Sequence, residues 1–327
     1  MRRSILIILV FLMMGKGISG QPDYPFSTWN PANSGNYSVA DREKDYDIRW
    51  IVIHVAEGSF KGTISWFKNP SARASAHFVI SMDGKNLVHM VRLKDIAWHA
   101  GNWEYNKHSI GIEIEGYVNK TIWPDTLYEN LARLIKYLSQ KYNISIKHIS
   151  GIAPPNPFSD SGIIGHIQVP DPNNPSLGGG RSHHKDPGAL FDWNKLMKYI
   201  EKVSLTPNNK YLSRLELRLA GKENSNTYLF EVKAFDKNNN LLPFTLYEIY
   251  INDRKICIQG TGPDGVNYFY HRFDEGKYLI KVSADSVESN IIEINVKSNK
   301  TFTFILLSFL ALLILLILIK YFREIRS

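Results

Sequence analysis

Apolar and polar positions alternate with two different periods along the chain, and the change of period divides it into two parts. In the first part, continuous apolar runs at 49–55 and 110–115 are typical of strands buried on both faces of a sheet. Apolar residues at helical spacing predict helices at 124–142 and 190–203. From about 210 to 296 the period becomes two, which predicts short strands. We therefore expect an α/β domain, a mixed central sheet with flanking helices, followed by a small all-β domain.

Shorter patterns complete the first part. A helix is expected at 63–67, and strands at 76–81 and 87–91 flank the hairpin signal Asp83-Gly84. Residues 147–185 are rich in proline and glycine and are expected to be mostly loop. An irregular stretch of this length inside a compact domain is usually functional or disordered. We favour the rim of a cleft, because this stretch separates residues that can bind a metal.

The second part is predicted to be a β-sandwich. Its strands are expected at 215–219, 228–234, 244–251, 268–271 and 278–282. The pattern is similar to the immunoglobulin-like modules of microbial surface proteins. A spacer is the leading interpretation of this domain, and wall or glycan binding is the alternative. The single cysteine, Cys257, excludes an internal disulfide and is expected to be a buried strand residue.

Both ends of the chain depart from the globular pattern. Residues 1–20 combine a basic start, a short apolar run and small residues, which predicts a secretory signal peptide, with an N-terminal membrane anchor as the alternative. Residues 301–319 carry no charge and would form a helix about 28 Å long, close to the thickness of a bilayer core. A buried core helix is the alternative there. Basic residues follow, as expected on the cytoplasmic side.

These observations predict a domain organisation for the whole chain. It consists of a signal peptide at 1–20, an extended N-terminal segment at 21–44, the α/β domain at 45–204, the β-sandwich at 205–298, a transmembrane helix at 301–319 and a cytoplasmic tail at 320–327. The net charge of +8 is concentrated at the ends, since residues 21–300 hold 33 basic and 30 acidic side chains. No nucleic-acid partner is expected from so even a balance.

Residue types that bind metals occur at three places in the first part. His54 ends an apolar run, His166 follows another, and Asp186 begins a turn. Two imidazoles and a carboxylate can occupy three corners of a zinc tetrahedron and leave the fourth for water, which is the arrangement of a hydrolytic zinc site. Between them in the sequence, Glu113 and Glu115 offer two carboxylates on the same face of one strand, and alternation alone does not separate them.

The region from about residue 25 to residue 203 resembles the zinc-dependent N-acetylmuramoyl-L-alanine amidases of the type 2 amidase and peptidoglycan-recognition superfamily. Six short sequence motifs carry the resemblance, in the family's order and over a little more than half of the chain. They are Ile51-Val52-Ile53-His54, Ser75-Ala76-His77-Phe78-Val79-Ile80, Ala97-Trp98-His99-Ala100-Gly101, Ser109-Ile110-Gly111-Ile112-Glu113, Gly165-His166 and Asp186-Pro187-Gly188.

The resemblance implies roles for particular residues. His54, His166 and Asp186 match the ligands of Zn²⁺ in the family. Glu113 matches the glutamate that activates or positions the water on the metal, which leaves Glu115 as a supporting or core residue.

Further residues match the family's cleft. His184 stands where many members have a lysine that stabilises the oxyanion, and the chain resembles a branch that has histidine there. His77, Trp98 and His99 match residues that line the substrate cleft. Trp98 could stack on a sugar or lactyl group, and His99 could bond a stem-peptide carbonyl. For His77 a core histidine is an equal alternative.

Together these features predict a zinc amidase with its catalytic domain outside the cell and a single membrane span. It would cut the amide between the lactyl group of N-acetylmuramic acid and L-alanine in peptidoglycan. One alternative is a non-catalytic receptor that binds peptidoglycan, and another is an amidase acting on a different cell-wall polymer. The enzyme is favoured over the receptor because non-catalytic relatives typically lose a zinc ligand, and all three positions are filled here.

Overall fold

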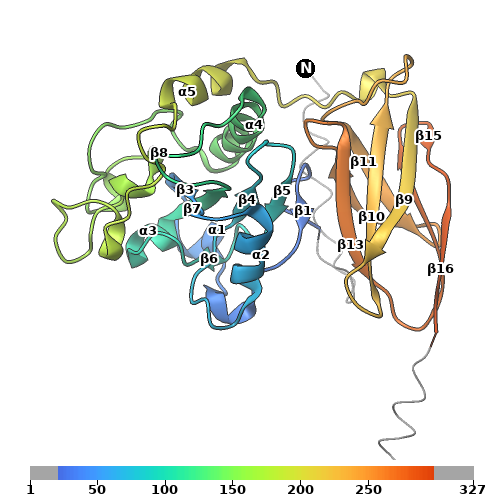
Figure 1. Cartoon of the computed structure of the whole chain (residues 1–327), viewed down its shortest axis with the longest axis horizontal. Helices are drawn as coiled ribbons and strands as arrows, with labels where there is room; N and C mark the ends of the chain where they lie inside the picture. Colours follow the sequence, from blue (N-terminus) through green and yellow to red (C-terminus); the bar gives the residue numbers. More distant parts are fainter. Residues whose placement is uncertain (1–20, 298–327) are drawn as a thin grey trace, which may run out of the picture.

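The computed structural model describes residues 21–297, which form two domains lying side by side (Figure 1). The predicted signal peptide at 1–20, transmembrane helix at 301–319 and cytoplasmic tail at 320–327 lie outside the described residues. Between residues 21 and 297, no helix combines the length and the apolar character needed to cross a bilayer.

The first domain is built on a six-stranded mixed sheet. Its strands in spatial order are β1 (Thr28–Trp29), β5 (Leu87–His89), β4 (Phe78–Ile80), β7 (Ser109–Ile114), β3 (Trp50–Val55) and β8 (Gly162–Gly165). From β4 to β8 all neighbouring strands are parallel, whereas β4 and β5 form the antiparallel pair predicted around Asp83-Gly84. β1 pairs parallel with β5 at the other edge. The predicted α/β class with a mixed central sheet is confirmed.

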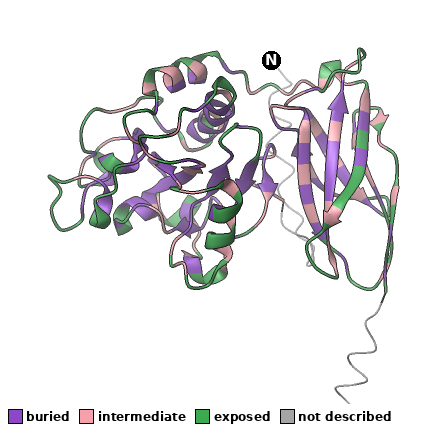
Figure 2. Cartoon of the chain, in the orientation of Figure 1, coloured by how far each residue is buried: buried purple, intermediate pink, exposed green. Residues whose placement is uncertain are grey.

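Five α-helices of the described residues flank this sheet. They are α1 (Arg42–Asp45), α2 (Phe60–Lys68), α3 (Trp103–His108), α4 (Asp125–Tyr142) and α5 (Trp193–Lys202). α4 and α5 pack against each other and share the main apolar core with the central strands, which Figure 2 shows as buried. The apolar residues at helical spacing on which the prediction of α4 rests are all buried: Leu127, Leu131, Leu134, Ile135 and Leu138. α4 ends at Tyr142, and Asn143, with a left-handed backbone (φ 54°), caps the helix.

Alternation along β3 decides which of its side chains reach the functional site. Ile51 and Ile53 point into the core shared with α4 and α5. Trp50 and Val52 point to the opposite face, where they pack with α3. His54 continues this second set two residues further on, so its ring emerges on the face away from α4, at the carboxyl end of the strand.

The stretch at 147–185, predicted to be mostly loop, contains one strand that the sequence pattern missed. β8 is only four residues long, and it pairs parallel with β3 at the edge of the sheet. So few residues between a proline-rich loop and a 3-10 turn show no period. β8 matters because it delivers His166 to the end of β3.

The second domain consists of two β-sheets around one apolar core. One sheet holds β13 (Val266–Arg272), β10 (Thr227–Phe235) and β9 (Arg214–Lys222), and the other β12 (Arg254–Gly260), β11 (Leu246–Ile251), β14 (Gly276–Ala284), β15 (Val287–Glu288) and β16 (Ile292–Val296). The predicted β-rich domain is confirmed, and its immunoglobulin-like class stays a prediction. Cys257 is buried on β12 and forms no disulfide.

The segment at 21–44 contributes to both domains. It adds β1 to the central sheet, and its β2 (Tyr37–Ser38) pairs with β6 (Ile96–Ala97). Thr28 Oγ1 also donates a hydrogen bond of 2.7 Å to the carbonyl oxygen of Tyr268 in the second domain. The segment therefore connects the domains instead of only lying across the first one.

Candidate metal centre

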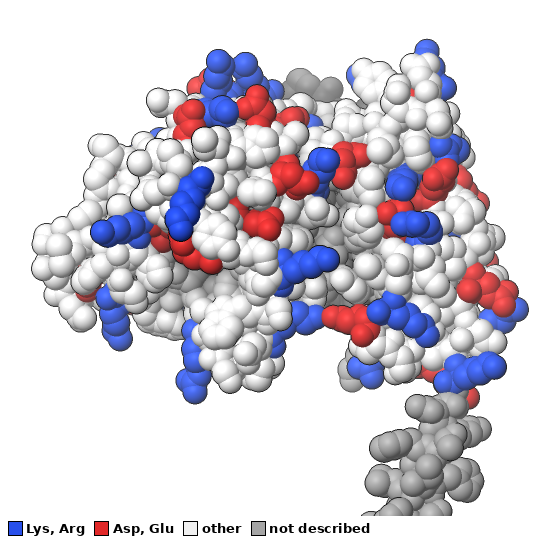
Figure 3. All heavy atoms as spheres, in the orientation of Figure 1, with Lys and Arg blue, Asp and Glu red and all other residues white. Residues whose placement is uncertain are grey.

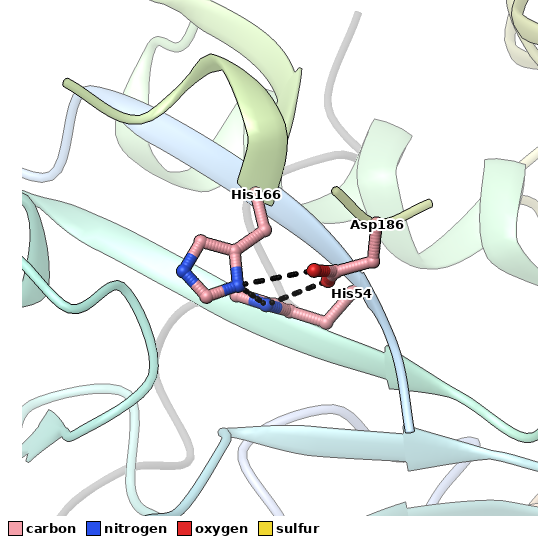
Figure 4. Close-up of side chains that lie close together, drawn as sticks. All are labelled: His54, His166 and Asp186. Carbon is pink, nitrogen blue, oxygen red and sulfur yellow. Dashed lines mark hydrogen bonds and ion pairs between the residues drawn. The ribbon is translucent and has the colours of Figure 1, made fainter. Parts of the chain in front are cut away.

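Three side chains that are distant in the sequence meet at the carboxyl ends of β3 and β8 (Figure 4). His54 Nδ1 lies 3.0 Å from His166 Nδ1 and 3.3 Å from Asp186 Oδ2, and His166 Nδ1 lies 3.4 Å from Asp186 Oδ1. All three residues are buried. The two histidines meet because parallel strands end at the same edge of the sheet, and the loop before α5 adds the carboxylate.

The separations of these three atoms fit a zinc ion. Bonds of about 2.0–2.1 Å in a tetrahedron place neighbouring ligand atoms about 3.3 Å apart. The observed separations of 3.0, 3.3 and 3.4 Å lie close to that value. Two imidazoles and one carboxylate also match the donor preference of Zn²⁺, and three protein ligands leave one position open. The three residues predicted from the sequence are thus the three that the fold brings together.

The electrostatics of the cluster favour the protonation states that a metal needs. Burial, reinforced by the nearby His166, lowers the pKa of His54 to about 4, so this ring is neutral at pH 7. Burial alone would raise the pKa of Asp186. The contacts with His166 and His54 outweigh burial and hold that pKa below its usual range. A neutral imidazole and an ionised carboxylate are the forms that ligate metals.

Glu113 is the carboxylate that faces the cluster. It lies opposite His54 in the register of β7 and β3, and its Oε2 is buried without a hydrogen-bond partner. Burial, and secondarily the charge of Asp186, raises the pKa of Glu113 to about 8. Glu115 instead accepts a 2.8 Å hydrogen bond from the backbone N–H of Phe60, the first residue of α2. The structure therefore separates the two glutamates that alternation left equivalent.

His184 reaches the cluster from its solvent side. Its ring stacks on that of His166, with centroids 4.6 Å apart and an interplanar angle of 13°. Its Nδ1 lies 3.8 Å from Asp186 Oδ1, and 56% of its side chain is exposed. Burial of the remainder, and then His166, lower the pKa of His184. A polar group that is accessible and adjacent to the cluster can contact a bound substrate.

His77 does not reach the cleft, contrary to the role that its sequence motif suggested. The ring is fully buried, and its Nδ1 accepts a 3.0 Å hydrogen bond from the backbone N–H of Gly111. Its Nε2 lies 2.8 Å from the guanidinium of the buried Arg42. With both nitrogens enclosed by the protein, His77 is a core histidine, the alternative considered above.

Trp98 and His99 both line the cleft, but they differ in what they can offer a substrate. Trp98 anchors its indole by donating a 2.9 Å hydrogen bond to Ser38 Oγ. His99 lies with Nδ1 3.0 Å from His54 Nε2 and with Nε2 3.3 Å from Ser109 Oγ. Both of its nitrogens are occupied within the protein, so the predicted bond from His99 to a stem-peptide carbonyl has no free nitrogen to make it.

Above the cluster lies a cavity of about 540 Å³ with a wall that sequence reasoning missed. This wall comes from α2, whose Trp66 lines the cavity with 51% of its surface exposed. The sequence signal that could have identified it is Trp66 itself, a large aromatic residue within the helix expected at 63–67, because such an apolar ring is costly to leave in water. Trp66 and Trp98 give this cavity two aromatic side chains.

Comparisons with known proteins agree with this geometry. Residues 44–189 match the family described as N-acetylmuramoyl-L-alanine amidase. N-acetylmuramoyl-L-alanine amidase A of Achromobacter lyticus is 32% identical over 182 residues, which cover 54% of this chain and 95% of that protein.

Solved structures with similar folds include a selenomethionine derivative of AmpD and the Staphylococcus aureus hydrolase AmiA in complex with its ligand. The AmpD derivative is 23% identical with a TM-score of 0.40, and the match covers 55% of this chain and 98% of that one. AmiA is 17% identical with a TM-score of 0.39, and the match covers 54% and 82%. Since the sequence match to the Achromobacter lyticus enzyme spans nearly all of that protein, the chain belongs to the N-acetylmuramoyl-L-alanine amidase family.

Proposed function

We propose that this amidase is zinc-dependent and cuts the amide bond between the lactyl group of N-acetylmuramic acid and L-alanine in peptidoglycan. The observation that carries the proposal is the set of three buried ligand atoms, 3.0–3.4 Å apart, at the base of a cavity that also contains an unpaired carboxylate. The matched relative from Achromobacter lyticus, named for this activity, supports the choice of bond.

His54, His166 and Asp186 would hold the zinc. When bound, zinc would polarise the scissile carbonyl and lower the pKa of water to about 7. In its ionised form Glu113, whose Oε2 is buried and unpaired, is placed to accept the proton of the attacking water and to return it to the leaving amine. His184 can donate a hydrogen bond to the carbonyl oxygen as charge develops there, because its ring borders the cluster and remains accessible.

The test is release of new L-alanine amino termini from purified peptidoglycan by the full-length chain, with His54→Ala as the matched control. We expect release that stops with a chelator, returns with added zinc and is absent in the variant. A wild-type chain that binds zinc and retains muropeptides without cutting them would indicate a receptor. Release of amino termini from another wall polymer, but not from peptidoglycan, would show that the substrate is that other polymer.

The cellular location belongs to the same proposal. Residues 301–319 would anchor the chain in the cell membrane by a single span, with the catalytic domain outside and 320–327 in the cytoplasm. The uncharged stretch and the basic residues after it support this orientation. Protease treatment of intact cells should degrade the catalytic domain and leave a membrane-bound C-terminal fragment. A catalytic domain that resists protease until the cells are lysed would contradict it.

A further inference from the structure

A chain of hydrogen bonds leads from the backbone of α3 to the outer nitrogen of His54. It begins at Ser109, the residue that follows α3, whose Oγ lies 2.5 Å from the carbonyl oxygen of Tyr105. This carbonyl belongs to the last turn of the helix, where no intrahelical N–H is available in the usual pattern. A carbonyl oxygen can only accept, so the hydroxyl proton of Ser109 is committed to Tyr105.

The next two links follow from that commitment. With its proton used, Ser109 Oγ must accept from His99, whose Nε2 lies 3.3 Å away and therefore carries the hydrogen. In a neutral His99 the other nitrogen, Nδ1, is then an acceptor. It lies 3.0 Å from His54 Nε2, so His54 is the donor of that bond. The only tautomer of His54 consistent with the chain has its hydrogen on Nε2 and its lone pair on Nδ1.

The lone pair on His54 Nδ1 faces the other two proposed zinc ligands. His54 Nδ1 is the atom that lies 3.0 Å from His166 Nδ1 and 3.3 Å from Asp186 Oδ2. In the opposite tautomer a hydrogen would occupy this nitrogen, which could not then ligate a metal. The two histidines differ in this respect, because the Nε2 of His166 is buried without any hydrogen-bond partner.

The position of His99 is itself fixed by two features of the fold. The ring lies directly against Gly111 of β7, where a Cβ would come within 2.5 Å of the ring carbon Cγ. The backbone N–H groups of His99 and Ala100 both donate to Asn106 Oδ1, at 3.0 and 2.8 Å. Gly111 therefore supports the ring and Asn106 holds the backbone, so the ring of His99 has little freedom to turn away from His54.

We propose that Ser109 and His99 are positioning residues that select the metal-binding tautomer of His54. This inference rests on the proposed zinc function and adds to it two residues that do not touch the metal. Partners of this kind orient a ligand and fix its tautomer, and their loss typically lowers metal affinity about 10- to 100-fold.

The first experiment measures the zinc dissociation constant of the full-length chain by competition with a chromophoric chelator. Ser109→Ala and His99→Phe should each weaken zinc binding about 10- to 100-fold. Ser109→Thr retains the hydroxyl and should restore most of the affinity. Ser139→Ala is the matched control, because it removes a buried hydroxyl from α4 that has no hydrogen-bond partner and does not line the cavity.

The second experiment reads the tautomer itself, in metal-free protein labelled with ¹⁵N-histidine. Long-range ¹H–¹⁵N spectra of the wild type should show the hydrogen of His54 on Nε2, and Ser109→Ala should show a mixture of tautomers. Unchanged zinc affinity and an unchanged His54 tautomer in Ser109→Ala would overturn the inference while leaving the zinc function intact. A wild-type chain that binds zinc no better than His54→Ala would overturn the zinc function first, and the inference with it.

Discussion

The two domains of this protein bury polar side chains in different ways. Among residues 21–297, every buried side-chain nitrogen or oxygen without a hydrogen-bond partner belongs to residues 24–166, in or beside the α/β domain. Of these atoms, only Glu113 Oε2 and His166 Nε2 belong to residues that line the cavity. Unpaired buried groups are costly, so the two that adjoin the cluster of His54, His166 and Asp186 indicate where chemistry is performed.

The β domain buries polar groups as well, but it pairs them. Asn267 Nδ2 donates to Tyr247 Oη at 3.0 Å and to Gln259 Oε1 at 3.1 Å, and its Oδ1 accepts from Thr28 Oγ1 at 3.3 Å. Thr261 Oγ1 accepts from the backbone N–H of Thr245 at 3.0 Å. Paired in this way, the same residue types stabilise the fold and leave no group free for a substrate. On the face shown in Figure 3, charged side chains of the described residues are interspersed in sign over both domains.

The largest expected effect on catalysis comes from replacing the unpaired carboxylate of Glu113. Glu113→Gln keeps the shape of the side chain but removes the proton acceptor, so kcat should fall about 10²- to 10⁴-fold while zinc stays bound. Steady-state kinetics on peptidoglycan together with metal analysis check this. A kcat within threefold of the wild type would show that Glu113 is not the base, and loss of zinc would show that it is needed for the site itself.

The same substitution should stabilise the metal-free protein at high pH. Burial raises the pKa of Glu113 from 4.5 to about 8, so the folded state holds a proton that the unfolded state releases between these values. The contribution of Glu113 to stability therefore decreases as pH rises from 4.5 to 8, by roughly 3–5 kcal/mol. Glu113→Gln removes this loss, and its advantage over the wild type should grow over that range in denaturant titrations. Parallel pH profiles for the two chains would contradict the raised pKa.

A substitution of a paired polar residue in the β domain should lower stability and leave catalysis unchanged. Asn267→Leu keeps the branched shape of the side chain but leaves Tyr247 and Gln259 without their shared partner and removes the acceptor of a hydrogen bond from Thr28. We expect a loss of about 1–3 kcal/mol in the free energy of unfolding, with kcat of the folded enzyme unchanged. Asn295→Leu, at an exposed position of β16, is the matched control. A large fall in kcat at full folding would mean that the β domain takes part in catalysis.

The contact between the domains can be tested by a substitution that is expected to change only stability. A Cβ on Gly260 would lie 2.4 Å from the ring of Phe26, which packs edge-on to Phe244 with centroids 5.8 Å apart. Gly260→Ala should cost about 1–3 kcal/mol of stability, because the buried ring must move. In the double variant Phe26→Ala/Gly260→Ala the cost of the alanine at 260 should nearly vanish. Additive costs would show that the clash is relieved elsewhere.

Much of the first domain could be predicted because its signals are long or periodic. The central strands at 49–55 and 110–115 and the helix at 124–142 follow from unbroken apolar runs and helical spacing. The strand at 162–165 could not be predicted, because four residues that include two glycines show no hydrophobic period. The strand at 28–29 is two residues long and is defined only by its partner β5.

For the site, the sequence motifs identified the residues but did not predict how their side chains are oriented. His54, His166 and Asp186 were predicted as a set and lie together. His77 and His99 belong to motifs of the same kind, yet one ring is enclosed in the core and the other bonds to a neighbouring histidine. Which way a ring turns depends on what it packs against across the sheet, such as Gly111 beneath His99, and that information is not local in the sequence.

The hydrogen bond between Thr28 and Tyr268 constrains the order in which the protein can assemble. The two residues are 240 positions apart in the chain. At a translation rate of about 5–20 residues per second, β13 leaves the ribosome roughly 10–50 s after β1. The partner strand β5 follows β1 much sooner, so the central sheet can close early. Phe26 can make its edge-on contact with Phe244 only after Phe244 is synthesised, so the apolar contact between the domains forms later than the pairing of β1 with β5.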